Sequence, residues 1–317
     1  MKTKEAIAKV TEISHQEWLD LRKQGIGGSD AATIIGLNPY SSPYYLYCEK
    51  MGEIPQKLDS EAMRQGRDLE QYVADRWNEL TGKKCRKNNY IWRSVQYPFM
   101  MANIDREVVG ENAGLECKTT TPYNKHDFSG GEIPLNYYVQ CQHYMAVMGY
   151  DKMYLAILVL GKGFYTFEIV RDEQEIQALV EREQAFFELL QTKTPPPLDN
   201  SEATQTALSV KYPNSEKTET VLTSEQASLL SRYDDLQATI KDLKSECDGI
   251  KCAIMEHMGT AEKAVSDSHT ITWSTRSTTK LDSKAIKTNY PEIFEKYATT
   301  TESRTFTVRK RKMKEAM

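Results

Sequence analysis

Apolar residues recur every three or four positions in several segments of the first 200 residues, a spacing typical of amphipathic helices that pack on a core. The longest such segment runs from Ser60 to Thr81 and is followed by Gly82, a residue type that often ends helices. Shorter segments begin at capping residues or at a proline, and one of them is expected to be capped by Ser29 or Asp30. These shorter helices are predicted over residues 15–23, 31–36, 43–51, 134–148 and 172–191.

Strand patterns lie between the predicted helices. Residues 153–160 form a continuous apolar run of the length typical of a strand buried on both faces. Gly161-Lys162-Gly163 then predicts a hairpin turn into the next strand. Helices and strands mixed in this way predict an α/β domain, with a mixed α+β sheet flanked by helices. The remaining strands are predicted at residues 90–94, 98–107, 115–119 and 164–170.

The pattern changes after Pro195-Pro196-Pro197, which opens a polar stretch. We therefore predict a first domain over residues 1–198, a linker over 199–222 and an accessory region over 223–317. In the accessory region, apolar positions follow one another at intervals of 4, 3, 4, 3, 4, 3 and 4 residues, the repeat of a coiled coil. This seam consists of Leu229, Tyr233, Leu236, Ile240, Leu243, Cys247, Ile250 and Ile254.

The seam can pack against the rest of the same chain, against a second subunit or against a different protein. Packing within the chain is the default expectation. Gly249 costs a helix about 1 kcal/mol relative to Ala, so it predicts a kink or an early end. Alternating residues at 270–273 and 304–308 predict a small sheet near the end of the chain. A helix over residues 283–297 is expected between its strands.

Composition and charge exclude several classes of protein. A hydrophobic fraction of 39% with 27% charged residues is that of a folded chain, neither disordered nor fibrous. No apolar run approaches the roughly 20 residues of a membrane span, and no signal-peptide core is found at the N-terminus. We therefore expect a cytoplasmic protein without a membrane partner.

Charge and cysteine spacing narrow the choice of ligands. The net charge of −4 argues against indiscriminate binding of polyanions, but leaves room for a local basic groove. The one dense basic run, at residues 309–314, is either a solvated tail or a contact for nucleic acid. The six cysteines include no CxxC pair, which disfavours a zinc ribbon, an iron–sulfur cluster and a disulfide framework. They fit reduced thiols in a cytoplasm.

Candidate chemistry centres on Glu116 and Lys118. Since they lie two residues apart in a predicted strand, their side chains emerge on the same face of the sheet. Asp105 lies upstream across a glycine-containing turn, so antiparallel strands can bring it beside Glu116. Two carboxylates and a backbone carbonyl supply the hard oxygen ligands that Mg²⁺ prefers. The alternative is an exposed cross-strand Glu–Lys pair, which is common in antiparallel sheets.

Further polar residues fall where they can reach this strand. Gln140 and Tyr144 are four residues apart on a predicted helix, so both project from one face. Gly66 and Glu70 lie on the long helix, from which the Glu70 carboxylate can complete a metal site. Tyr144 as a core aromatic residue and Glu70 as a solvated one are the structural alternatives.

In their order along the chain, these motifs resemble those of a known family. Gly66-x-x-x-Glu70, Asp105, Leu115-Glu116-Cys117-Lys118 and Gln140-x-x-x-Tyr144 are similar to the motifs of the PD-(D/E)xK nucleases of the lambda-exonuclease branch, and above all of the YqaJ-type viral recombinase proteins of phages and prophages. The resemblance spans about residues 12–192. Asn103-Ile104 stands before Asp105 where that family has a proline. The resemblance implies a PD-(D/E)xK, restriction-endonuclease-like core.

The resemblance also implies roles for the residues that match its metal motif. Asp105, Glu116 and the backbone carbonyl of Cys117 would ligate Mg²⁺ or Mn²⁺, with help from Glu70. Lys118 would orient and activate the attacking water, and its pKa would be lowered if the site desolvates it.

A second set of matching residues would hold the substrate. Gln140 would position Lys118 or the scissile phosphate, with Tyr144 supporting it. Trp18-x-x-x-Arg22 and Gly28-Ser29-Asp30-Ala31-Ala32 are similar to the segment in which the family's Arg and Ser, seven residues apart, bind the terminal 5′-phosphate. Arg22 and Ser29 are therefore the expected phosphate-binding pair.

The function implied by the resemblance is a metal-dependent 5′→3′ exonuclease that acts on double-stranded DNA ends and leaves 3′ overhangs for single-strand annealing recombination. It would act in a bacterial host, with a RecT-like annealing protein as partner and a homo-oligomer, a ring-shaped trimer, enclosing the DNA. Two alternatives remain. One is another nuclease on the same fold, Cas4-like, RecB-like or an endonuclease; the other is a non-catalytic protein that binds DNA ends and uses the seam as an interaction module.

Overall fold

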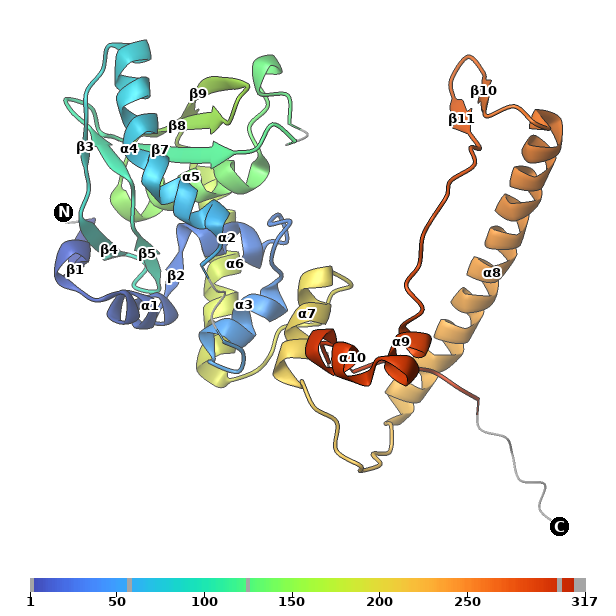
Figure 1. Cartoon of the computed structure of the whole chain (residues 1–317). Coiled ribbons are helices and arrows are strands. Elements are labelled where there is room, and N and C mark those ends of the chain that lie inside the picture. Colours follow the sequence, from blue (N-terminus) through green and yellow to red (C-terminus); the bar gives the residue numbers. More distant parts are fainter. Residues whose placement is uncertain (1–2, 56–58, 124–125, 301–303, 311–317) are drawn as a thin grey trace. The chain divides into compact units, whose positions relative to one another are not determined.

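The computed structural model describes residues 3–55, 59–123, 126–300 and 304–310 (Figure 1). The chain divides into two compact units, Met1–Pro213 and Asn214–Met317. The first unit holds all of the candidate site residues. The second consists of one long helix followed by short elements.

A five-stranded sheet forms the centre of the first unit. Its strands run in the order β3-β6-β7-β8-β9. The neighbours β7 and β8 are parallel, with α5 (Leu135–Met148) between them in sequence, and every other pair is antiparallel, so the sheet is mixed. The bounds of the strands are β3 Cys85–Lys87, β6 Arg106–Val108, β7 Ala113–Thr120, β8 Lys152–Val159 and β9 Gly163–Val170.

Helices cover both faces of this sheet (Figure 1). Leu155 and Ile157 of β8 pack with residues of α5, whereas Tyr154 and Ala156 pack on the other face with Trp77 of α4, which spans Glu61–Thr81. A strand buried on both faces needs apolar residues at every position, which explains the continuous apolar run of β8. The predicted fold class, a mixed sheet flanked by helices, is confirmed.

A smaller sheet and the N-terminal helices complete the first unit. The strand order of this sheet is β1-β4-β5-β2. Its strands are β1 Lys4–Lys9, β2 Ile26–Gly27, β4 Tyr90–Ser94 and β5 Met100–Ala102. The remaining α-helices are α1 His15–Lys23, α2 Gly28–Ile34, α3 Pro43–Lys50, α6 Glu173–Thr192 and α7 Glu202–Lys211, and two short 3-10 turns lie at Val10–Glu12 and Phe128–Gly130.

Two predictions near the site are wrong in detail. Residues 98–107 do not form one strand, because β5 pairs in the small sheet and β6 in the large one, and the chain bends between them. Asp105 lies at this bend. The helix predicted over 31–36 begins earlier, at Gly28, with Gly27 as its N-cap; Asp30 lies inside the first turn and accepts a hydrogen bond from the Gly27 N–H at 3.0 Å.

The predicted linker is also wrong over part of its length. Helix α7 lies within residues 199–222 and belongs to the first unit. Its Ala207 is fully buried against α3, and the hydroxyls of Thr204 and Ser42 hydrogen-bond at 2.7 Å. The boundary between the units therefore falls after Pro213 rather than at residue 198.

The second unit begins with α8, Ser224–Met258, which starts at a capping box formed by Thr223 and Gln226. The helix continues through Gly249 to Met258, so the early end expected there does not occur. The seam residues from Leu229 to Ile250 are exposed. The default expectation, that the seam packs against the rest of the same chain, is therefore not met among the described residues.

The short elements after α8 also differ from the expectation. Strand β11 (Thr270–Thr272) pairs with β10 (Lys263–Val265), its neighbour in sequence, and residues 304–308 form no strand. The expected helix over 283–297 is two helices, α9 (Ser283–Asn289) and α10 (Pro291–Tyr297), because Pro291 cannot continue the first. Of the basic run, residues 311–314 lie outside the described part of the chain.

The described residues bear on the cysteines and on membrane-spanning helices. All six cysteines are free thiols. In the part of the chain that the structure describes, the helices are all too short or too polar to cross a lipid bilayer.

Candidate active site

Glu116 and Lys118 lie on the face of β7 that is covered by α5. Their neighbours Leu115 and Cys117 pack on the opposite face, against α4. The Lys118 Nζ lies 2.7 Å from Glu116 Oε1. Glu116 is only 3% exposed, so this ion pair is not the solvated cross-strand pair that the sequence left open.

Asp105 lies beside this pair, as the sequence predicts. Strand β6 pairs with β7 so that Arg106 lies opposite Leu115, which places Asp105 next to Glu116 just before β6 begins. The Asp105 side chain accepts a hydrogen bond from the backbone N–H of Cys117 at 2.8 Å. This bond fixes the carboxylate at the bend between the two sheets.

Gln140 of α5 joins the carboxylate, the ammonium and a tyrosine hydroxyl. Its side-chain oxygen accepts from Lys118 Nζ at 2.9 Å, and its amide nitrogen donates to Glu116 Oε1 at 2.7 Å and to the Tyr144 hydroxyl at 2.9 Å. Tyr144 in turn donates to the backbone oxygen of Asn103 at 3.2 Å. The expected convergence of Gln140 and Tyr144 on β7 is what the structure shows.

Glu70 takes a different position from the one expected. Its carboxylate forms a salt bridge with the buried Arg106, and Lys87 Nζ lies 3.9 Å away. Arg106 also donates to the backbone oxygen of Asp105 at 2.9 Å. Glu70 therefore reaches the site through Arg106, a residue that the sequence did not single out.

The surroundings of Asp105 and Lys118 change the protonation of these two groups. Burial raises the pKa of Asp105 well above its usual range, and the negative charges of Glu116 and Glu70 raise it further. Burial opposes the charge on Lys118, but attraction to Glu116 and Asp105 outweighs it and the pKa of Lys118 is raised, whereas desolvation alone predicts a lowered one. A site with this excess of negative charge favours binding of a cation.

The residues present fit a divalent metal ion. Glu116 Oε2 is buried and has no hydrogen-bond partner among the described residues, which is costly for a carboxylate oxygen unless something else binds it. Within the same described ranges, three His, Cys, Asp or Glu side chains do not converge on one point. The candidate ligands are thus Asp105, Glu116 and the Cys117 carbonyl, while Glu70 is held by Arg106.

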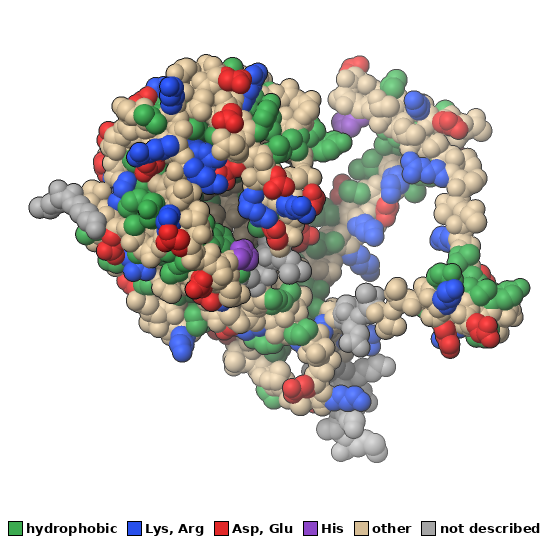
Figure 2. Space-filling view, turned by 60° about the vertical axis from the view of Figure 1, so that its left-hand side comes forward, with side chains coloured by type: hydrophobic (Ala, Val, Ile, Leu, Met, Phe, Trp, Pro, Cys, Tyr) green, Lys and Arg blue, Asp and Glu red, His purple; other side chains and the backbone are tan. Residues whose placement is uncertain are grey.

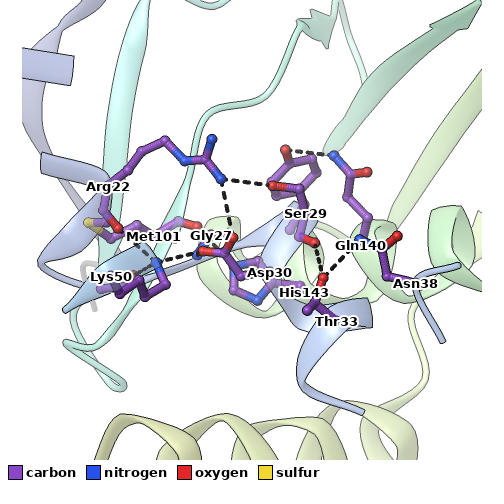
Figure 3. A network of polar contacts seen from close by, with 12 residues as sticks. Arg22, Gly27, Ser29, Asp30, Thr33, Asn38, Lys50, Met101, Gln140 and His143 are labelled. Carbon is purple, nitrogen blue, oxygen red and sulfur yellow. Dashed lines mark hydrogen bonds and ion pairs between the residues drawn. The ribbon is translucent and has the colours of Figure 1, made fainter. Parts of the chain in front are cut away.

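Arg22 and Ser29 lie together at the start of α2 (Figure 3). The Arg22 guanidinium, at the end of α1, stacks over the Trp18 ring with 5.0 Å to the centroid, and it donates to the Ser29 hydroxyl at 3.2 Å. The Arg22 side chain is 39% exposed and Ser29 is exposed. Both groups remain accessible to an anion.

Asp30 and Lys50 form a buried ion pair beneath Arg22. Asp30 accepts from Arg22 at 3.2 Å and lies 2.8 Å from Lys50 Nζ (Figure 3). Lys50 also donates to the backbone oxygens of Arg22 and Gly25 at 2.8 and 2.7 Å. Although burial opposes its charge, Lys50 and Arg22 lower the pKa of Asp30 to about 2, so it stays ionised and holds the guanidinium in place.

Gly28 brings the Arg22–Ser29 pair close to the carboxylate cluster. A Cβ at this position would lie 2.5 Å from the Tyr144 ring, a distance that real side chains do not adopt. The absence of a side chain therefore lets α2 approach α5 closely. Tyr144 thus contacts Gly28 on one side and Gln140 on the other.

A groove of about 940 Å³ extends from the Arg22–Ser29 pair to the edge of the carboxylate cluster. Arg22 and Ser29 line it together with Glu70 and Asp105. The surface of the first unit mixes acidic and basic side chains around a hollow (Figure 2), in keeping with the net charge of −4. The groove therefore connects the Arg22–Ser29 pair with Asp105.

Three residues that organise the site were not predicted from the sequence: Asp30, Lys50 and Arg106. The sequence offers Asp30 as a helix cap and as a neighbour of Ser29, but not as a partner of Arg22. Lys50 and Arg106 carried no local signal, because their partners lie 20 and 36 residues away in sequence.

Comparison with known proteins agrees with these motifs. A family model described as "YqaJ-like viral recombinase domain" matches residues 17–151. A protein of Bacillus subtilis (strain 168), "Uncharacterized protein YqaJ", is 36% identical over 313 residues, which are 97% of this chain and 98% of the relative.

Among solved structures, an alkaline exonuclease from Laribacter hongkongensis superposes with a TM-score of 0.46 at 18% identity, covering 56% of this chain and 94% of that chain. A phage-related exonuclease from Haemophilus somnus 129PT gives a TM-score of 0.44 at 15% identity, covering 56% of this chain and 99% of that one.

Proposed function

Because the chain belongs to the family of YqaJ-like viral recombinase proteins, we propose that it is a metal-dependent nuclease that degrades double-stranded DNA from its 5′ ends and leaves 3′ overhangs. The observation that carries the proposal is the cluster of the buried Glu116 and Gln140 with the partly buried Asp105 and Lys118, in which Glu116 Oε2 has no partner among the described residues. The groove that passes Asp105 also passes Arg22 and Ser29.

Arg22 and Ser29 recognise the 5′ end of the DNA strand. Arg22 binds the terminal 5′-phosphate with charge-assisted hydrogen bonds, and the Ser29 hydroxyl donates to the same group. Asp30 keeps the guanidinium aimed at the groove. A 5′ terminus bound there places an adjacent phosphodiester toward Asp105, which gives the 5′→3′ direction.

Lys118 and Gln140 orient the reacting groups. The raised pKa of Lys118 keeps it an ammonium, so it donates hydrogen bonds to the attacking water or to the scissile phosphate. Gln140 fixes the direction of the Lys118 side chain, and Tyr144 fixes Gln140. Asp105, Glu116 and the Cys117 carbonyl would hold Mg²⁺ or Mn²⁺, which when bound would act as a Lewis acid and lower the pKa of a bound water.

The partners belong to the same proposal. A single strand exposed by such digestion is the substrate of an annealing protein, so a RecT-like protein is the expected partner. A ring of subunits, a homotrimer, would keep the enzyme on its DNA between cleavages.

The test uses a linear duplex labelled at one 5′ end, with or without the terminal phosphate, incubated with Mg²⁺ or Mn²⁺. We expect 5′ mononucleotides from the phosphorylated duplex, a strong preference over the 5′-hydroxyl duplex, and loss of at least about a thousandfold in rate with Lys118→Ala. Lys162→Ala, on the turn between β8 and β9, is the matched control and keeps the wild-type rate.

Other outcomes point to other functions. Cleavage of a covalently closed circle would establish an endonuclease instead. Binding of DNA ends without cleavage under either metal would establish an end-binding protein that lacks catalysis.

A further inference from the structure

The exposed seam of α8 is an apolar feature that the proposed nuclease does not use. Helix α8 has 35 residues and is about 50 Å long. Exposed apolar side chains at the surface of a monomer of this kind mark an interaction site. The large exposed residues of the seam are Leu229, Tyr233, Leu236, Ile240, Leu243 and Ile250.

The residue types in the seam favour a particular number of strands. The intervals between seam residues assign each of them to position a or d of a heptad. Position a holds Tyr233, Ile240, Cys247 and Ile254, and position d holds Leu229, Leu236, Leu243 and Ile250. A β-branched residue at a with Leu at d favours two parallel strands. Two of the four a positions are Ile and three of the four d positions are Leu.

The charges beside the seam favour the same arrangement. In a parallel pair, position g of one helix faces position e of the next heptad in the other helix. Glu246 at g would therefore face Lys251 at e of a second copy, and the pair would occur twice. Lys251 is 68% exposed, with only a local contact to Asp248 at 3.3 Å, so it is free to move to this carboxylate. The other g–e pairs, such as Arg232 with Gln237, bring no like charges together.

An antiparallel pair gains no such contact. In the antiparallel register that matches all eight seam residues, Glu246 lies beside Thr239 of the other helix, and Lys244 beside Gln237. Opposite charges therefore meet only in the parallel arrangement.

We propose that α8 pairs with α8 of a second copy of this chain as a parallel, in-register, two-stranded coiled coil. The pair joins two subunits through the second unit, independently of any contact made by the first. The proposal goes beyond the nuclease function and does not depend on it.

Cys247 and Cys252 provide the decisive test. In the proposed pair Cys247 occupies an a position, where it meets its own counterpart within the Cα separation of roughly 4.4–6.8 Å that a disulfide requires. Cys252, five residues further on, occupies position f on the outer side. The full-length protein is treated with diamide, which takes up the two electrons and two protons released when two thiols form a disulfide, and is then run on a non-reducing gel.

We expect a disulfide-linked dimer in the wild-type protein and in Cys252→Ser, and its loss in Cys247→Ser. A second measurement, the mass in solution by light scattering, uses Leu243→Asp on the seam and Ser245→Asp at position f as its control. Leu243→Asp should halve the mass and abolish the link, whereas Ser245→Asp should change neither.

The charged pair is tested in the same assay. Glu246→Lys should weaken association about tenfold, because two attractions become two repulsions. The double variant Glu246→Lys with Lys251→Glu should restore it.

Several results would overturn the proposal. A halved mass for Leu243→Asp without any Cys247 link would mean that the helices pair antiparallel or out of register. A mass that Leu243→Asp leaves unchanged, or a wild-type monomer, would mean that the seam does not join copies of this chain and is left for a different protein. Because these readouts do not involve DNA, failure of the coiled coil and failure of the nuclease are separate results.

Discussion

Helices α4 and α8 are both long and amphipathic, but the apolar face of α4 is buried and that of α8 is exposed. In α4, Val73, Ala74 and Trp77 are buried against the central sheet. In α8, Leu236 and Leu243 are about half exposed, at 44% and 56%. The spacing of apolar residues thus shows that a helix has a face to bury, while only the tertiary structure shows whether its own chain supplies the surface.

The largest expected effect tests this difference through stability. Trp77→Ala removes a fully buried side chain and should lower the free energy of unfolding of the first unit by about 3–5 kcal/mol, whereas Leu243→Ala should lower it by less than about 0.5 kcal/mol. Urea denaturation followed by near-UV circular dichroism measures both.

Trp77→Phe is the matched variant at the same site. The indole nitrogen of Trp77 has no hydrogen-bond partner among the described residues, so the phenyl ring should cost much less than the alanine. Equal losses for Leu243→Ala and Trp77→Ala would mean that the stability of the first unit depends on the seam of α8 as much as on its own core.

Gly28 and Gly249 differ in the space around them, and replacing each by alanine should have opposite effects on stability. Gly28→Ala would drive a Cβ into the Tyr144 ring and should cost about 1–3 kcal/mol, with a lower cleavage rate because Tyr144 supports Gln140. Gly249 of α8 has open space around it, so Gly249→Ala should stabilise that helix by about 1 kcal/mol. Thermal melts of both variants, read with the single-turnover rate, measure these effects. A silent Gly28→Ala would contradict the close packing of α2 on α5.

Asp30→Asn tests whether the buried ion pair positions Arg22. Losing the charge frees the guanidinium and leaves Lys50 unpaired, so the rate on a 5′-phosphorylated duplex relative to a 5′-hydroxyl duplex should fall about tenfold. The exposed Asp20→Asn on α1 is the control. An unchanged ratio in a folded Asp30→Asn protein would show that Asp30 has only a structural role.

The effect of pH concerns His143 of α5 and Glu183 of α6, both fully buried and 2.8 Å apart. The second ring nitrogen of His143 donates to the Met101 carbonyl, so the pair shares one proton between His143 Nδ1 and Glu183. Burial opposes the His143 charge, but Glu183 raises the pKa of His143 overall, and burial raises that of Glu183.

Stability should therefore fall as pH rises above the ordinary histidine pKa of about 6.5, because the folded pair keeps a proton that the unfolded chain loses. Glu183→Gln should flatten this slope by up to about 1.4 kcal/mol per pH unit in unfolding experiments between pH 7 and 9. Glu188→Gln, on the exposed side of α6, should leave the slope as it is. An identical slope in both variants would show that the pair carries no extra proton.

The sequence predicts which residues form the candidate site better than it predicts the tertiary contacts that position them. Glu116 and Lys118 could be placed on one face because strand geometry alternates, and Gln140 and Tyr144 because helix geometry repeats. The break between β5 and β6 could not be read in residues 98–107, since it depends on pairing with two different sheets. The role of Lys50 depends on a tertiary contact with Asp30, and pairing of β11 with β10 rather than with residues 304–308 depends on the cost of closing a longer loop.

The bend at Asp105 has a consequence for the order in which the protein becomes active. Strand β5 on one side of the bend belongs to the small sheet and β6 on the other side to the large one, so Asp105 reaches its place only when both sheets have formed. The large sheet in turn needs β8, which is synthesised more than 30 residues after β7 begins. A nascent or partly folded chain therefore lacks the complete carboxylate cluster, so the proposed nuclease would cleave no DNA in the cell that makes it until folding is finished.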